Sequence, residues 1–189
     1  MIKLNLGSGG HRLAGWANLD ISNTAEIRCD LRGPLPYNTE TVSYIFSEHF
    51  IEHLDEVDGF KLFKECYRVL VPGGKLRISC PDLEQYVKAY LNWKNEARAD
   101  SKMFNSGTNY LNYAILGEAL NGIKYLSPIT TSCDHGHKYY YDFDELSTKL
   151  QKVGFKDVER CQWKVSTTPQ LANLEYRQPL RDLIVEATK

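Results

Sequence analysis

The sequence lacks a long apolar run and has no surplus of charge of either sign. No apolar stretch reaches the roughly 20 residues that a membrane-spanning helix needs, and the opening MIKLNLGSGG lacks the apolar core and cleavage site of a signal peptide. Lys and Arg total 23 against 24 Asp and Glu, which argues against a mainly electrostatic hold on nucleic acid. We therefore expect a soluble cytoplasmic protein, and a length of 189 residues suits one α/β domain.

Recognisable patterns for disulfides and metal sites are also missing. The five cysteines are odd in number and form no CxxC pair, which favours free, buried thiols over a disulfide framework or a zinc site. His49 and His53 lie four residues apart, but the chain has no HExxH motif. His135 and His137 form only a short HxH. The sequence therefore predicts no bound metal.

What is present is a strand–helix–strand pattern in the first half. Short apolar runs predict strands at residues 2–6, 16–21, 25–31, 42–47 and 75–80. Apolar residues at three- and four-residue steps predict a helix over 60–70, which Pro72-Gly73-Gly74 would end. Strands and helices that alternate with short connections are typical of a parallel sheet with helices on both faces.

The second half is more varied. We expect helices over 82–99 and 143–153, the latter stopped by Gly154, and closing strands at 155–160 and 183–187. Residues 171–177 read as a helical turn or as surface. The segment 101–142 is rich in Tyr, Asn, Ser and Gly, and an insertion of this length is typical of a lid over a binding site. A dimerisation surface is its alternative use.

A glycine-rich loop follows the first predicted strand. KLNLGSGG places three glycines in four positions, which lets the backbone approach a ligand closely at the carboxyl end of a parallel strand. Asp20 ends the next strand and can accept hydrogen bonds from ribose hydroxyls, while Asp30 ends the third and can accept from an adenine amino group. Together they outline an adenosine site.

The spacing argues against a nicotinamide cofactor. Arg12 stands where the third glycine of G-x-G-x-x-G belongs, and Asp20 comes too early to leave room for a full helix after the loop. That helix would hold the pyrophosphate. No GxxxxGK[ST] loop occurs either. A cofactor without phosphates therefore fits better.

The ordered set LNLGSGG, NLDI, CDL, YIFSEHFIEHL, ECYRVLVPGGKLRISCPDL and HKYYYDFDELSTKLQKVGFKDVE resembles the class I S-adenosylmethionine-dependent methyltransferases. It is similar in particular to small predicted methyltransferases with a shortened segment after the glycine loop. The resemblance implies a Rossmann-like α/β fold, a mostly parallel sheet with an antiparallel C-terminal edge, and S-adenosylmethionine as cofactor. It also implies a cofactor site formed by Gly7, Ser8, Gly9, Gly10, Asp20, Ile21, Asp30, Leu31, Ser47 and Glu48.

The acceptor is less well defined. His49 and His137 are the candidate catalytic residues, because a histidine near pH 7 can take a proton from an acceptor hydroxyl. His53 reads as structural. No NPPY-like tetrapeptide follows the fourth strand, so a base amine is disfavoured as acceptor, and analogy with relatives of this type suggests a sugar hydroxyl or another small molecule. A non-catalytic S-adenosylmethionine-binding sensor or accessory protein is the alternative.

Overall fold

The structure is a computed structural model and describes residues 1–23, 25–92, 136–177 and 181–189. Its described strands form a seven-stranded sheet in the order β3-β2-β1-β4-β5-β7-β6. The first five strands pair in parallel, and β7 runs antiparallel to both β5 and β6. The expected mostly parallel sheet with an antiparallel C-terminal pair is therefore confirmed. The strands are β1 (Ile2–Leu6), β2 (Ala17–Asp20), β3 (Ile27–Arg28), β4 (Val42–Glu48), β5 (Leu70–Pro81), β6 (Lys156–Arg160) and β7 (Asp182–Thr188).

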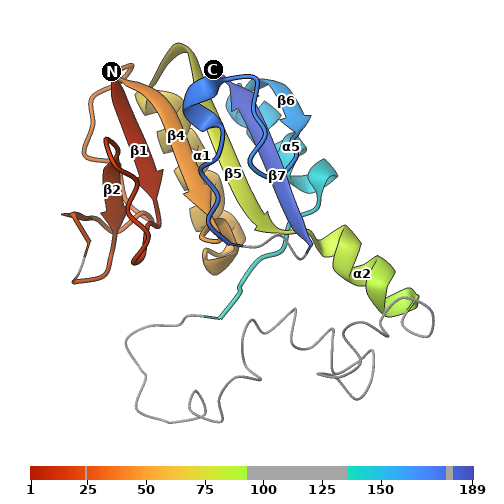
Figure 1. Cartoon of the computed structure of the whole chain (residues 1–189). Helices are drawn as coiled ribbons and strands as arrows, with labels where there is room; N and C mark the ends of the chain where they lie inside the picture. Colours follow the sequence, from red (N-terminus) through yellow and green to blue (C-terminus); the bar gives the residue numbers. More distant parts are fainter. Residues whose placement is uncertain (24, 93–135, 178–180) are drawn as a thin grey trace.

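Two helices cover one face of this sheet (Figure 1). The helices α1 (Glu56–Val69) and α5 (Phe143–Val153) each begin at an aspartate, Asp55 and Asp142, whose carboxylate accepts a hydrogen bond from a backbone N–H of the first turn. Gly154, at φ 120°, ends α5 as expected. The apolar stripes of both helices pack on Leu4, Leu6, Ile45, Leu76, Ile78, Leu183 and Val185, which point to the same side of their strands.

The opposite face has a different cover. Residues 161–177, here called the covering segment, cross this face (Figure 1) and include the short helix η3 (Pro169–Leu171). Leu171 of this segment packs with Trp16 and Phe46 in a small apolar cluster. The remaining side chains that point this way from the inner strands are largely polar and buried: Asn5, Asn18, Arg77, Ser79 and Glu186.

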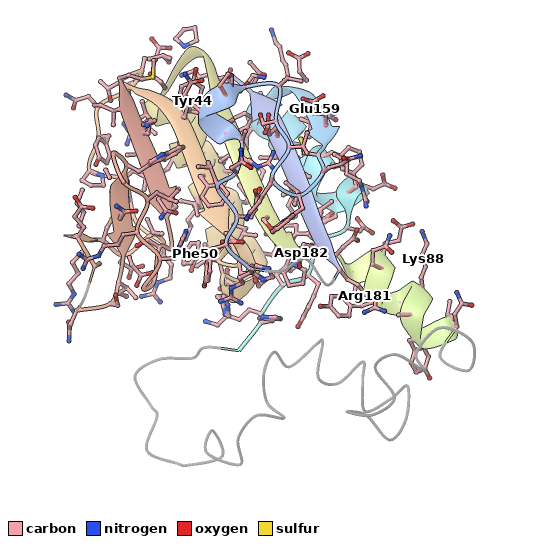
Figure 2. All side chains as sticks on the ribbon, viewed as in Figure 1. Tyr44, Phe50, Lys88, Glu159, Arg181 and Asp182 are labelled. Atoms are coloured by element: carbon pink, nitrogen blue, oxygen red, sulfur yellow. The ribbon has the colours of Figure 1, made fainter. Side chains whose placement is uncertain are left out.

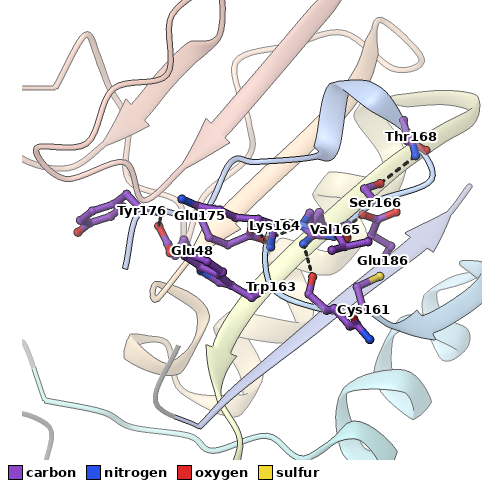
Figure 3. Close-up of polar contacts among 12 residues, drawn as sticks. Glu48, Cys161, Trp163, Lys164, Val165, Ser166, Thr168, Glu175, Tyr176 and Glu186 are labelled. Atoms are coloured by element: carbon purple, nitrogen blue, oxygen red, sulfur yellow. Dashed lines mark hydrogen bonds and ion pairs between the residues drawn. The ribbon is translucent and has the colours of Figure 1, made fainter. Parts of the chain in front are cut away.

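Arg77 of β5 is the main anchor of the covering segment. Its fully buried guanidinium lies 2.6 Å from Oε1 of Glu175, within the segment, and 2.5 Å from Oε1 of Glu186 on β7. It also donates to the carbonyl oxygens of Val165 and Gln162, at 3.0 and 3.1 Å. Figure 3 shows these parts of the covering segment gathered over β5 and β7. One buried guanidinium thus holds two carboxylates together on the sheet face that α1 and α5 do not cover.

The Pro-Gly-Gly turn lies elsewhere than the sequence suggested. Helix α1 already ends at Val69, and β5 begins at Leu70, so Pro72, Gly73 and Gly74 lie within the strand. The pairing jumps from Val42–Leu70 to Tyr44–Lys75, which makes this stretch a bulge. Gly73 has φ 77°, a conformation that favours glycine.

Other expected elements hold with changed bounds. Helix α2 (Leu83–Leu91) begins after Asp82 as predicted; residues 93–99 of the expected helix lie outside the described residues. So do residues 101–135 of the expected lid and Cys133. The described cysteines are free thiols, as expected: Cys29, Cys66, Cys80 and Cys161. In the described parts of the chain, no helix has the length and apolarity that a bilayer crossing requires.

Candidate functional site

The glycine loop turns sharply at the carboxyl end of β1. The backbone N–H groups of Gly7 and Ser8 both donate to the carbonyl oxygen of Leu19, at 2.9 and 3.1 Å. Gly7 has φ 67°, and a Cβ built on it would lie 2.2 Å from the ring of Phe50. Backbone conformation and lack of space therefore both require glycine here.

Asp20 joins this loop to the end of β2. Its Oδ2 accepts from the N–H of Gly9 at 2.9 Å, and its Oδ1 accepts from the N–H of Ser22 at 2.8 Å. Each carboxylate oxygen has a further lone pair, so Asp20 can hold the loop and still accept from two ligand hydroxyls. Ser8 lies beside it with a buried hydroxyl that has no partner in the described structure. An orphaned polar group of this kind fits a site built for a polar ligand.

Asp30 lies at the rim of the same site, past the end of β3. Its carboxylate is paired with the guanidinium of Arg32, whose Nη2 lies 2.6 Å from Oδ2. The Arg32 hydrogen bonds lower the pKa of Asp30, so the group is an anionic acceptor at neutral pH. Leu31, next in the chain, is buried, whereas Ile21, which also lines the site, is 53% exposed and offers an uncovered apolar surface.

These residues line a cavity of about 660 Å³ at the carboxyl ends of β1, β2 and β4. Figure 2 shows Phe50 and Asp182 at this end of the sheet, with Tyr44 and Glu159 toward the other end. Ser47 and His137, both expected in the site, are not among the lining residues; the hydroxyl of Ser47 donates to the carbonyl of Leu6. The expected site residues that do line the cavity are Gly7, Ser8, Gly9, Gly10, Asp20, Ile21, Asp30, Leu31, Glu48 and His49.

The covering segment supplies a wall that sequence reasoning missed. The buried carboxylate of Glu48, at the end of β4, accepts from the N–H groups of Tyr176 and Arg177 at 3.3 and 3.2 Å. Burial raises the pKa of Glu48, although these two N–H groups act in the opposite direction. The ring of Tyr176 stacks on His11 with 4.1 Å between centroids. Tyr176 and Arg177 thereby enter the cavity lining from the far end of the sequence.

His49 is held between two carboxylates. Its Nδ1 lies 3.3 Å from Glu52 Oε1 and its Nε2 lies 3.3 Å from Asp182 Oδ2. Burial disfavours the imidazolium, but Asp182 and Glu52 outweigh that effect and raise the pKa of His49 to about 9. Near neutral pH the ring therefore carries both protons and acts as a donor.

The remaining histidines of the region meet at one side of the cavity. His53, which the sequence suggested was structural, lines the cavity together with Lys138. His137 lies just behind, with its ring edge-to-face on His53 at 5.0 Å between centroids. Its Nδ1 is 2.8 Å from the hydroxyl of Tyr140. Nothing in the sequence marked His53 or Lys138 as a cavity residue, apart from their closeness in the chain to His49 and His137.

Comparisons with known proteins agree with this geometry. Residues 5–78 match a family described as a methyltransferase domain, and no curated protein sequence matches the chain. A solved S-adenosylmethionine-dependent methyltransferase from Thermotoga maritima is 16% identical with a TM-score of 0.55, over 100% of this chain and 82% of that one. One from Mesorhizobium loti is 17% identical with a TM-score of 0.53, over 100% and 90%.

At such identities the likeness establishes the fold. The matched family segment contains the glycine loop, Asp20, Asp30 and the end of β4, which are the residues that surround the cavity. The chain therefore has the fold of the class I S-adenosylmethionine-dependent methyltransferases, and its residues 5–78 match the methyltransferase-domain family.

Proposed function

We propose that this methyltransferase acts on a hydroxyl group of a small-molecule or saccharide acceptor. The observation that carries the proposal is that one cavity is lined both by the adenosine-type residues and by hydrogen-bonding side chains, among them His53, Lys138 and Arg177. Such side chains suit an acceptor rich in oxygen. Bound S-adenosylmethionine supplies an electrophilic methyl group on a sulfonium.

The residues around the loop would hold the cofactor. In this proposal Gly7, Ser8, Gly9 and Gly10 surround the methionine part, with the Ser8 hydroxyl gaining a partner. Asp20 accepts from the ribose hydroxyls, and Ile21 packs on the adenine. Asp30 and Leu31 border the adenine edge. Glu48 and Ser47 support the site from the end of β4, Ser47 by fixing the end of β1 through its bond to Leu6.

His137 and His49 are the proposed catalytic residues. The acceptor oxygen contributes the electron pair of the new C–O bond, the electrons of the broken C–S bond stay on sulfur, and the acceptor proton must leave. In this proposal His137 receives that proton by way of His53, whose ring it contacts edge-to-face at the cavity wall. His49, protonated between Glu52 and Asp182, would instead orient the acceptor as a hydrogen-bond donor. Much of the rate would come from alignment of acceptor and methyl group.

A non-catalytic S-adenosylmethionine-binding protein is the second candidate. It is favoured by the short connection between Leu6 and Ala17, where the described structure has loop rather than helix, and by His49 being held in its protonated form. In that case the cavity would bind cofactor without turnover.

The two candidates separate in a turnover assay. The purified protein would be incubated with S-adenosylmethionine and panels of free saccharides, phenols and amines, with an RNA oligonucleotide as a class we expect to be inert, and S-adenosylhomocysteine would be quantified by mass spectrometry. Product with hydroxyl compounds, lost in His137→Ala, supports the proposal. Cofactor binding without product in any panel supports the accessory protein, and methylation of amines alone contradicts the assigned acceptor class.

A further inference from the structure

Three side chains with metal-binding atoms converge next to the cavity. One ligand atom each of Glu52, His53 and His137 lies within 4.8 Å of the others. Glu52 and His53 belong to the short helix η1 (Ile51–His53) that follows β4. His137 comes from the segment that returns to the sheet, and the N–H of its neighbour Lys138 donates to the carbonyl of Glu52 at 2.7 Å. This backbone bond fixes the two segments beside each other.

The carboxylate of Glu52 is an independent sign of a missing partner. Glu52 is 1% exposed, and neither carboxylate oxygen accepts a hydrogen bond within the described parts of the chain. His49 Nδ1 lies 3.3 Å from Oε1, as an ion pair without hydrogen-bond geometry. Oε2 has no hydrogen-bond partner among the residues that the structure describes. His49 therefore compensates the charge through Oε1, and Oε2 is the oxygen that lacks a partner, since buried polar atoms are normally hydrogen-bonded or coordinated to a metal.

The donor set indicates which cations would fit. Two imidazoles and one carboxylate suit first-row transition metals, with which this combination recurs in zinc enzymes and in open iron sites, whereas magnesium and calcium prefer oxygen ligands. We propose that Glu52, His53 and His137 form a site for a divalent transition-metal ion, such as zinc or iron, at the wall of the cavity.

The surroundings of the three residues agree with that assignment. Ligating histidines usually bond a neighbour through their second ring nitrogen, and Nδ1 of His137 is 2.8 Å from the Tyr140 hydroxyl. Ligating carboxylates are supported in turn, here by His49. Since His53 lines the cavity, an ion held by three protein ligands would keep an open position toward it, where an acceptor hydroxyl could bind and release its proton to solvent. With the ion bound, His53 and His137 act as ligands, and this role replaces the proton transfer to His137 described under the proposed function.

The sequence could not indicate this site, and it predicted none. The ligand spacing matches no metal motif, because His137 joins the other two only through the fold. The His49–His53 pair that the sequence does show is not the pair involved: His49 faces Glu52 and Asp182 instead.

Cobalt binding tests the site without reference to activity. The chelator-treated protein would be titrated with CoCl2 while its visible absorption is recorded, and ZnCl2 binding would be measured by calorimetry. We expect one ion per chain with cobalt bands typical of nitrogen ligands. Affinity should fall at least 10- to 100-fold in His53→Ala and in His137→Ala, since loss of an outer-shell partner alone costs that much. His11→Ala, which changes a cavity-lining histidine outside the cluster, should bind as the wild type does.

Folding is checked by thermal melts of each variant in chelator, and Glu52→Gln serves as a third variant that keeps the shape of the side chain. The site does not exist if neither cobalt nor zinc binds, or if binding is unchanged in His53→Ala and His137→Ala. Should these variants lose methyl transfer while no ion binds, the histidines act on the acceptor directly and the metal site is wrong. Failure of the turnover assay alone bears only on the proposed acceptor, because cation binding is measured without one.

Discussion

At the scale of single residues, the site depends on a few positions that each satisfy more than one structural requirement. Gly7 must adopt a positive φ and must leave room for the ring of Phe50. Asp20 accepts from two backbone N–H groups and, in the proposed cofactor site, also accepts from ligand hydroxyls. Both were predicted from the sequence, because a glycine loop and an acidic residue at successive strand ends are local patterns.

Gly7→Ala should destabilise the protein. A positive φ costs an L-residue about 1–2 kcal/mol, and the overlap with the Phe50 ring adds about 1–3 kcal/mol. We expect the free energy of unfolding in urea to fall by the sum, about 2–5 kcal/mol. Gly10→Ala is the matched control, since a Cβ there meets nothing within 4 Å, and it should shift stability by less than about 0.5 kcal/mol. Equal effects of the two changes would contradict the role given to Phe50.

Asp20→Ala should weaken S-adenosylhomocysteine binding. Loss of a partner of polar ligand groups costs about 1–3 kcal/mol, which is about 5- to 150-fold in Kd. Calorimetry measures the affinity, and circular dichroism checks that the loop change leaves the fold intact. Asp157→Asn, an exposed change on β6 at the far edge of the sheet, should bind normally. An unaltered Kd in Asp20→Ala would show that Asp20 only holds the glycine loop and does not contact the ligand.

Other site residues had no comparable signal. Tyr176 and Arg177 reach the cavity because their backbone N–H groups bond Glu48, more than a hundred positions earlier in the chain. The sequence there reads as a turn or as surface, since nothing in its local pattern marks a hydrogen bond to a distant strand end. The place of His53 at the cavity wall had no local signal for a similar reason: its neighbour His137 comes from another segment.

At the scale of elements, the covering segment takes the place that helices occupy on the other face. It leaves an unusual interior, in which Arg77 is buried between Glu175 and Glu186 rather than among apolar side chains. The sequence of β5 gives no sign of this buried ion pair, because apolar and polar residues alternate along the strand. Leu76 and Ile78 face the helices, and Arg77 between them has the pattern of a solvent-facing residue on a half-exposed strand.

Arg77→Met should therefore be costly, because it leaves two carboxylates without their partner. Removing one member of a buried ion pair typically costs about 3–5 kcal/mol, and we expect a loss of that size in urea unfolding. Lys88→Met breaks an exposed pair with Glu84 in α2, and should cost no more than about 0.5 kcal/mol. A triple change that also makes Glu175→Gln and Glu186→Gln should recover part of the loss. If Arg77→Met and Lys88→Met lower the free energy of unfolding by similar amounts, Arg77 does not anchor the covering segment.

Elements with a strong local pattern were predicted closely, and those shaped by pairing were not. Helix α5 begins and ends where its aspartate and glycine caps place it. The Pro-Gly-Gly stretch reads as a turn from its composition, yet it lies in a strand because Leu70 already pairs with Val42 and the glycines form the bulge. Which strands pair depends on residues that are far apart in the sequence, so the strand propensities of single residues do not predict it.

At the scale of the whole molecule, the cavity is where distant parts of the chain meet. Its walls come from the ends of β1, β2 and β4, the helix η1, the segment before α5 and the end of the covering segment. A ligand in that position contacts elements from both halves of the sequence. Its binding energy should therefore stabilise the fold as a unit rather than one loop.

S-adenosylhomocysteine should accordingly raise the melting temperature in a way that depends on the cavity. At 100 times its Kd, a ligand that binds only the folded state adds about 2.7 kcal/mol. In a domain of 189 residues, each kcal/mol raises Tm by about 2–4 °C, so we expect a shift of about 5–11 °C by scanning calorimetry. NAD should give no shift, because Arg12 replaces the third glycine of a pyrophosphate loop and no helix follows to bind the phosphates.

Asp20→Ala, compared at the same ligand concentration, should show a smaller shift than wild type. No shift with millimolar S-adenosylhomocysteine, or an equal shift with NAD, would contradict the assignment of the cavity to this cofactor.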